Sequence, residues 1–327
     1  MVVATSCNHK DLCYHHRDHA HRFHINVIAD YRYDWEEYCG GTNWQEEWPD
    51  DYIPYDSLRP TTPSGLRVVN YNEQGDHNLH NLSAQGGVIN LYEGENDLLF
   101  YNNDTEYIVF SRTGNDASTR ATTRTRTRAS YLGNEYANEG EQTVSPPDML
   151  YANYIENYIP EKTIDPVDLP ITLQPLVYTY KIRYEFEAGL KYVAMARGAL
   201  SGMAISVMLN TGNTSEEAAT ILYDATVTDW GVRAIVNSFG APAYPHSNYP
   251  TRVDGTKHAL NLELLLRNGK TVTYEFDVTD QVKAQPHGGV IVVDGISVDE
   301  QQGQQGSGAF DVEVNDWGPY EDIELPL

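Results

Sequence analysis

The stretch Leu176-Val-Tyr-Thr-Tyr-Lys-Ile-Arg-Tyr-Glu-Phe186 has the most regular pattern in the chain. Leu176, Tyr178, Tyr180, Ile182, Tyr184 and Phe186 fall on one face, and Thr, Lys, Arg and Glu residues alternate with them. Successive side chains of a strand point to opposite faces, so this alternation predicts a β-strand with one apolar and one polar face. We therefore expect the second half of the chain to be built on a β-sheet.

A second pattern, further along the chain, predicts a β-hairpin. Leucines at positions 260, 262, 264 and 266 lead into Asn268-Gly269, and apolar residues alternate again from Val272 to Val278. Asn-Gly accepts the positive φ angles of a type I′ turn, which is the tightest connection between two antiparallel strands. A further strand is expected over 289–298, and helices are limited to single turns at 214–219 and 277–282.

The first half of the chain repeats this signature in shorter runs. Residues 23–33 alternate apolar and polar side chains and predict the first strand. Short apolar runs bounded by Gly, Asn and Asp predict further strands at 66–71, 87–92, 97–101 and 105–111. No helical pattern separates these runs, which argues against βαβ units. The chain is therefore predicted to be all-β, as sandwiches of short strands.

Prolines indicate where the chain divides. They stand at positions 146, 147, 160, 166, 170 and 175, and a proline lacks the donor that a central strand needs. We place the boundary near residue 168. Residues 1–22 are expected to form a polar tether, 23–168 an N-terminal β-sandwich, and 169–327 a C-terminal β-sandwich with a strand-like tail.

The charge balance excludes two classes of partner. Asp and Glu total 47 against 22 for Lys and Arg, which gives a formal net charge of −25. Such a field repels phosphate backbones and anionic lipid headgroups, so no nucleic-acid partner is expected. It suits a soluble surface outside the cell. No apolar run has the length that a membrane-spanning helix needs.

The chain also lacks the motifs of common catalytic sites. It has no Gly-x-Ser-x-Gly elbow, no cysteine–histidine pair on a rigid scaffold and no phosphate-cradling glycine loop. Six of its 11 histidines lie between His9 and His24, and together they could bind zinc or copper. Nothing fixes their geometry, so a polar spacer is favoured over a metal site. We expect no enzyme activity, no cofactor and no bound metal.

An acidic, aromatic stretch at 34–56 has no period and is expected to be a loop. Its acidic pairs, Glu46-Glu47 and Asp50-Asp51, stand beside Trp44 and Trp48. Carboxylates next to tryptophans can form a sugar-binding or glycosidase site. Adjacent carboxylates in a loop more often face water, and we favour that interpretation here.

The N-terminus offers two interpretations. Val3-Ala-Thr-Ser-Cys7 places small residues directly before a cysteine, as at the end of a lipoprotein signal. Cys7 is then a lipid attachment site; otherwise it is a stray cysteine in an ordinary tail. Cys13 and Cys39 either pair in an oxidising compartment or remain free thiols.

The C-terminus alternates like a strand. The apolar positions of this strip are Phe310, Val312, Val314, Ile323, Leu325 and Leu327. An alternating apolar strip at a chain end is typical of a strand that is offered to another subunit. Upstream, Thr and Arg alternate from Arg120 to Arg128, which predicts either a counter-charge stripe on one face or a solvated edge strand.

Three segments of the first half, Cys7–His16, Tyr101–Glu106 and Pro147-Asp148, together resemble a group of Bacteroidales surface lipoproteins that is related to the fimbrillins. In the second half, Ala199–Ala204, Ser238–Gly240, Phe276–Val282 and Phe310 through Trp317 resemble the C-terminal domain of fimbrillin and fimbrial-anchor proteins. The resemblance extends over nearly the whole chain.

This resemblance implies two tandem transthyretin-like β-sandwiches and export to the outer membrane with a lipid on Cys7. Stalk and tip subunits of that family polymerise when a protease removes the first strand and a partner's strand fills the groove. Anchor-type members stay lipidated at the base. The implied partners are other fimbrial subunits, joined by β-strand addition, and ligands on host or bacterial surfaces.

The chain departs from the stalk pattern at its cleavage site. Arg32 lies inside the expected first strand, and Arg59 precedes Pro60, a bond that trypsin-like proteases disfavour. Cleavage at Arg17 or Arg22 would leave 23–33 in place. We therefore expect an anchor or accessory subunit that keeps its first strand.

The alternative is a monomeric surface lipoprotein that binds glycans through its aromatic loop. Trp44, Trp48 and Tyr52 are its candidate platform. Such rings also occur as plugs of a β-sandwich, so the two interpretations stay open.

Overall fold

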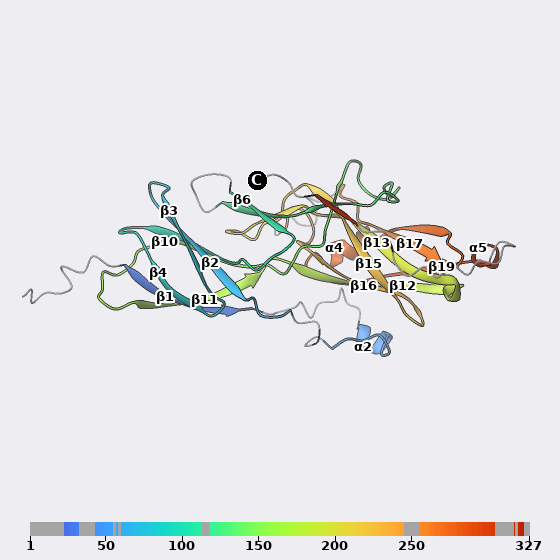
Figure 1. Cartoon of the computed structure of the whole chain (residues 1–327), viewed down its shortest axis with the longest axis horizontal. Helices are drawn as coiled ribbons and strands as arrows, with labels where there is room; N and C mark the ends of the chain where they lie inside the picture. The colour runs from blue at the N-terminus through green and yellow to red at the C-terminus, as the bar shows by residue number, and fades with distance from the viewer. Residues whose placement is uncertain are drawn as a thin grey trace, which may run out of the picture.

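The computed structural model describes residues 23–32, 43–54, 57, 60–112, 118–244, 255–304, 317 and 320–323. Two β-bodies lie end to end along the long axis of the molecule (Figure 1). The prediction of an all-β protein is confirmed. No helix in these ranges is long and apolar enough to cross a membrane.

The first body is a closed barrel in the order β1-β11-β10-β5-β2-β3-β4. Its strands are β1 (His24–Tyr31), β2 (Gly65–Asn72), β3 (His77–Ser83), β4 (Gly86–Asn90), β5 (Asn96–Asn102), β10 (Tyr151–Tyr158) and β11 (Val167–Pro175). The sheet closes because β4 pairs with both β1 and β3. This body is therefore one continuous barrel, where the short runs had predicted a sandwich. Ile25, Leu66 and Phe100 are among the side chains that fill it.

The second body is a broad sheet in the order β18-β17-β13-β15-β16-β12-β19. Its strands are β12 (Tyr178–Ala188), β13 (Val193–Ala204), β15 (Ala218–Val227), β16 (Gly231–Ser238), β17 (Ala259–Leu266), β18 (Thr271–Asp277) and β19 (Gly289–Ser297). Tyr180, Ile182 and Tyr184 lie fully inside its core, on the face of β12 that the alternation predicted. Helical pieces are short: α2 (Trp44–Glu47), the 3-10 turn η1 (Leu190–Tyr192), α4 (Thr279–Ala284) and α5 (Glu300–Gly303).

Strands from the first half of the chain also cross to the second body. They are β6 (Ile108–Arg112), β7 (Thr119–Thr123), β8 (Thr125–Thr127) and β9 (Gln142–Val144), and they meet β14 (Ser206–Met208) and β20 (Glu321–Ile323). β7 pairs with β6 and β14, whereas β9 pairs with β15 and β8. Side chains of both halves, including Leu99, Ile108, Val207 and Phe239, share a core cluster. The two bodies are thus interleaved by the chain.

The boundary expected at residue 168 falls inside β11. This strand runs parallel to β1 and pairs with β10 only at its end, where Pro175 lies opposite Tyr151. Over most of its length β11 is not paired with β10. A strand edge without a partner tolerates prolines, because no ladder hydrogen bond is lost there. Proline density had argued against a central strand here, and β10 and β11 were missed for that reason.

The predicted hairpin of β17 and β18 is confirmed, but its turn type was wrong. Leu265 lies opposite Thr271, the N–H of Gly269 donates to the carbonyl of Leu266, and Gly269 takes a φ of 80°. Asn268 is not among the described residues with positive φ, which a type I′ turn would require. The predicted helical turn at 277–282 is present as part of α4, whereas 218–219 begin β15.

Candidate assembly site

The first strand is held on both sides within the barrel. β1 runs parallel to β11 from Ile25 to Tyr31, and antiparallel to β4. Ile25 and Val27 are buried in the barrel core, and the hydroxyl of Tyr31 donates to the carbonyl of Ala84 at 3.0 Å. Removal of β1 would therefore leave a groove between β4 and β11 with two rows of unpaired backbone groups.

Gly86 brings β4 close to this strand. Its φ is 109°, and a Cβ at this position would lie 2.0 Å from the carbonyl oxygen of Val27. Only a glycine combines this backbone conformation with so close an approach.

Gly86→Ala is therefore expected to lower the free energy of unfolding by roughly 3 kcal/mol, because backbone strain and a clash with β1 add together. Gly94→Ala is the matched control. Gly94 also has a positive φ, of 92°, but nothing lies within 4 Å of its Cβ position. The control should lose only about 1 kcal/mol. Urea unfolding measures both, and equal losses would show that the contact with β1 is not decisive.

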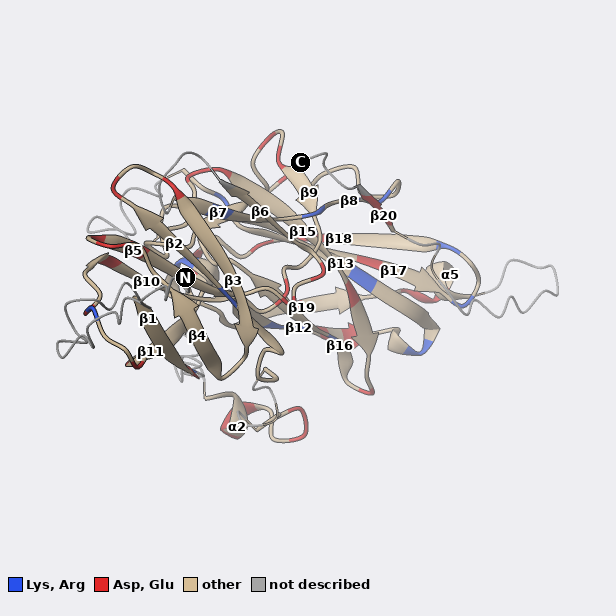
Figure 2. Ribbon diagram, turned by 60° about the vertical axis from the view of Figure 1, so that its left-hand side comes forward, with Lys and Arg blue, Asp and Glu red and all other residues tan. Residues whose placement is uncertain are grey.

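The connection after β1 lies against the second body. We call residues 43–54, which include α2, the aromatic loop; α2 lies below β12 and β16 in Figure 1 and outside the strands of both bodies in Figure 2, and Asp51 of the loop contacts β12 and β16. Asp51 of this loop is buried, and its carboxylate lies 3.0 Å from Lys181 Nζ, 3.2 Å from Arg183 and 3.0 Å from Arg233. We call these three side chains the cationic face. Lys181 also donates to the Asp51 carbonyl at 2.6 Å.

Burial of Asp51 corrects the expectation that these acids face water. Glu46, Glu47 and Asp50 are exposed as expected, whereas Asp51 is neutralised by cations from β12 and β16. Desolvation lowers the pKa of Lys181 to about 8; Arg233 and Arg183 add to this effect, and Asp51 opposes it. The cluster is thus electrostatically crowded as well as buried.

The aromatic rings of the loop contact the same cations. The ring of Trp44 lies 3.6 Å from Lys181 Nζ and 5.2 Å from the ring of Tyr52, while Trp48 lies 5.0 Å from the Arg183 guanidinium. These are cation–π contacts, which gain strength where water is excluded. The structure does bring Trp44, Trp48 and Tyr52 together, and glycan binding by them stays a prediction.

The described C-terminal residues lie across the outer side of the second body. Trp317 stacks on Arg197 at 3.8 Å, and the Tyr320 hydroxyl donates to Asp224 at 2.8 Å. Burial and the nearby Asp224 raise the pKa of Tyr320 to about 12. Asp322 accepts two hydrogen bonds from Arg126, at 2.8 and 3.3 Å, where β20 pairs with β8.

The predicted donor segment is therefore described only in part. Ile323 ends β20, whose backbone pairs with β8 of the same chain. Phe310, Val312, Val314, Leu325 and Leu327 lie outside the described residues, as do Cys7, Cys13, Cys39 and the histidines of the tether.

The Thr-Arg alternation does not form a single exposed stripe. Arg120 is exposed on β7, but Arg126 binds Asp322. Arg128 is buried and lies 3.5 Å from Glu263. Arg124 lies between β7 and β8 and interrupts the alternation. Arg120, Arg126 and Arg128 therefore lie in three different environments.

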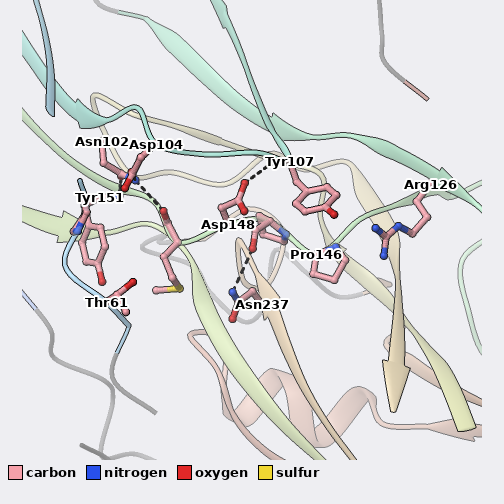
Figure 3. Close-up of a pocket in the computed structure, with 12 residues that line it drawn as sticks. Thr61, Asn102, Asp104, Tyr107, Arg126, Pro146, Asp148, Tyr151 and Asn237 are labelled. Carbon is pink, nitrogen blue, oxygen red and sulfur yellow. Dashed lines mark hydrogen bonds between the residues drawn. The ribbon is translucent and has the colours of Figure 1, made fainter. Parts of the chain in front are cut away.

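A cavity of about 440 Å³ lies where the proline segment crosses between the bodies (Figure 3). Asp148 accepts the N–H groups of Glu106 at 2.7 Å and Tyr107 at 2.5 Å, and Asn237 donates to the carbonyl of Pro147 at 3.3 Å. Burial opposes ionisation of Asp104, yet hydrogen bonds from Asn102 and Ser64 lower its pKa. These polar groups mainly bind one another, so they hold the crossing in place.

The described ranges contain no group of three or more His, Cys, Asp and Glu side chains that could hold a metal ion.

The cationic face was not predicted from the sequence. The one sequence feature that pointed to this face was the expected strand at 176–186, whose polar side carries Lys181 and Arg183 in an otherwise acidic chain. No local pattern identified Asp51 as the acid that pairs with them.

Comparison with known proteins supports the fimbrial resemblance. A Bacteroides ovatus protein named "Putative fimbrium anchoring subunit Fim4B" is 25% identical over 306 residues, which is 84% of this chain and 88% of that protein. A crystal structure of a "putative adhesin" from Bacteroides ovatus shares the fold, with a TM-score of 0.61 and 21% identity over 91% of this chain and 98% of that one.

The fimbrial anchor protein Mfa2 from Porphyromonas gingivalis is also similar, with a TM-score of 0.42 and 11% identity over 83% of this chain and 90% of that one. The resemblance to Bacteroidales fimbrial proteins that the sequence predicted is confirmed by the relative named Fim4B. A family model described as "Domain of unknown function (DUF5119)" matches residues 55–224, from just after the aromatic loop into β15. The match covers more than half of the chain, and the chain belongs to this family.

Proposed function

We propose that this protein is a non-enzymatic anchor or accessory subunit of fimbriae at the cell surface. The observation that carries the proposal is the position of β1, which is paired on both edges and buried at Ile25 and Val27. A subunit that keeps this strand closes its own groove and has no site there for a partner's strand. That state suits the base of a fimbria or an accessory position better than the stalk. The relationship to Fim4B supports the same assignment.

The finer parts of the proposal concern attachment and assembly. Cys7 carries a lipid, such as palmitate, that holds the protein in the outer membrane. Other fimbrial subunits join it by β-strand complementation, with Phe310 through Leu327 as the donated segment, and the assembled fimbria adheres to host or bacterial surfaces. Backbone pairing suits this role because it satisfies a whole row of donors and acceptors. The transthyretin-like topology and the division at residue 168 stay predictions.

The N-terminal mass of the native protein tests the proposal. The complete gene is expressed in a Bacteroidales host, and the outer-membrane protein is analysed by intact and N-terminal mass spectrometry. We expect an acylated Cys7 followed by an uncleaved chain through β1. Cys7→Ser is the matched control, and it should lose both the added mass and the membrane fraction. A mature chain that begins after residue 33 would instead make the protein a polymerising stalk or tip subunit.

A further inference from the structure

The aromatic loop is attached to the second body through few contacts. Its own backbone hydrogen bonds are local: Glu46 and Glu47 donate to the carbonyl of Asn43, and Asp51 donates to that of Trp48. None of the residues of α2 is buried. Within the described part of the chain, the hydrogen bonds and ion pairs between this loop and the cationic face all use one residue, Asp51. The attachment of the loop is therefore concentrated in the buried carboxylate of Asp51 and in the cation–π contacts of Trp44 and Trp48.

The cationic face carries more positive charge than the loop neutralises. Three cations surround one carboxylate, and the other acid in contact is Glu185, 2.6 Å from Arg183. Positive charge is scarce in this molecule, as the few blue segments in Figure 2 show. A buried carboxylate is required here, because removing the single acid would leave uncompensated charges in a desolvated place.

One aromatic side chain at this site belongs to the second body itself. Trp230, just before β16, lies 3.6 Å from the Arg183 guanidinium, on which Trp48 of the loop also lies. If the loop lifts, Trp230 and the cationic face remain on the second body as a site with charge and an aromatic surface. The loop shows which ligand fits this site: a short segment with a helical turn and an aspartate between aromatic residues.

We propose that the cationic face and Trp230 form a docking site for an acidic, tryptophan-bearing peptide segment of a neighbouring subunit, and that the chain's own aromatic loop occupies this site until it is displaced. Charge complementarity selects the aspartate, and the rings of Trp44 and Trp48 show where aromatic side chains of the incoming segment would lie. The inference rests on the proposed assembly with neighbouring subunits but not on lipidation or on retention of β1, so the peptide-binding test and the mass measurement can fail independently.

A synthetic peptide of residues 43–54 tests the site in trans. The receptor is the full chain with Asp51→Asn, which weakens its own loop, and binding is measured by fluorescence anisotropy of the labelled peptide. We expect the native peptide to bind this variant at least about tenfold more tightly than it binds the wild-type chain, where the loop competes. The peptide with Asp51→Asn should bind at least about tenfold more weakly, whereas the peptide with Asp50→Asn should bind like the native one.

Two further variants keep the test decisive. A receptor that also carries Arg183→Gln should lose the peptide, and circular dichroism verifies that each receptor is folded. If Asp51→Asn does not fold, Trp44→Ala with Trp48→Ala weakens the loop while keeping its aspartate. A wild-type dimer that dissociates when peptide is added would support the site and identify the partner as a second copy. Absence of binding to a folded receptor, or equal binding of the two peptide variants, would overturn the proposal and make the loop a fixed connection.

Discussion

Val27→Asp is expected to expel the first strand from the barrel and to lower the free energy of unfolding by about 4 kcal/mol. Val27 is 1% exposed and lies in the ladder between β4 and β11. A carboxylate there has no cation to pair with among the described core residues, so the strand leaves or the barrel loses stability. Urea unfolding measures the loss, and hydrogen exchange of the peptide 24–31 reports whether β1 has left.

Ile28→Asp is the matched control for this experiment. Ile28 follows directly in the same strand, but its side chain is 46% exposed and points out of the barrel. The change should cost less than about 1 kcal/mol and leave the amides of β1 protected. Equal effects of the two substitutions would contradict the idea that the inner face of β1 seals the barrel.

The same variant can test whether the groove accepts a strand from another molecule. A peptide of residues 23–32, added in excess to Val27→Asp, is expected to fill the vacated groove and to raise the urea midpoint. The physical reason is that it restores both ladders and the burial of Ile25. A peptide that carries the Val27→Asp change is the control. Failure of the native peptide to bind would argue against β-strand complementation at this site.

Acid is expected to destabilise the protein through His258. This ring is buried, and neither ring nitrogen has a hydrogen-bond partner among the described residues. Burial, assisted by Lys283 and opposed by Asp277, lowers the pKa of His258 from 6.5 to about 4. Between these two values the unfolded chain binds a proton that the folded chain does not. The free energy of unfolding therefore falls as pH falls through this window, by about 3 kcal/mol in total.

His258→Leu should remove this part of the pH dependence. Because the substitution also changes packing, which shifts stability at every pH, the readout is the slope between pH 6.5 and 4 from urea unfolding. The wild-type chain should lose about 3 kcal/mol more than the variant over that range. Carboxylates that do not interact with His258 contribute equally to both chains and cancel in the difference, whereas the interaction with Asp277 belongs to the His258 effect that is measured. Parallel slopes would show that another group controls acid unfolding.

Only parts of the candidate site could be predicted from the sequence. The first strand was predicted over 23–33 and is present as β1. The prediction was possible because alternating apolar and polar residues indicate which face of a strand is buried. The aromatic loop was also recognised, but its role was not. Asp50 and Asp51 are chemically identical neighbours, and only the position of β12 and β16 makes one exposed and the other buried.

The all-β class, the inward face of β12 and the hairpin of β17 and β18 follow from local sequence patterns. These features depend on period-2 alternation and on turn residues, which act over a few neighbouring positions. The tertiary structure alone decided that the first sheet closes into a barrel, that β11 accommodates its prolines, and that Asp51 meets Lys181 and Arg183. Those outcomes depend on contacts between residues distant in the chain, for which a local pattern carries no signal.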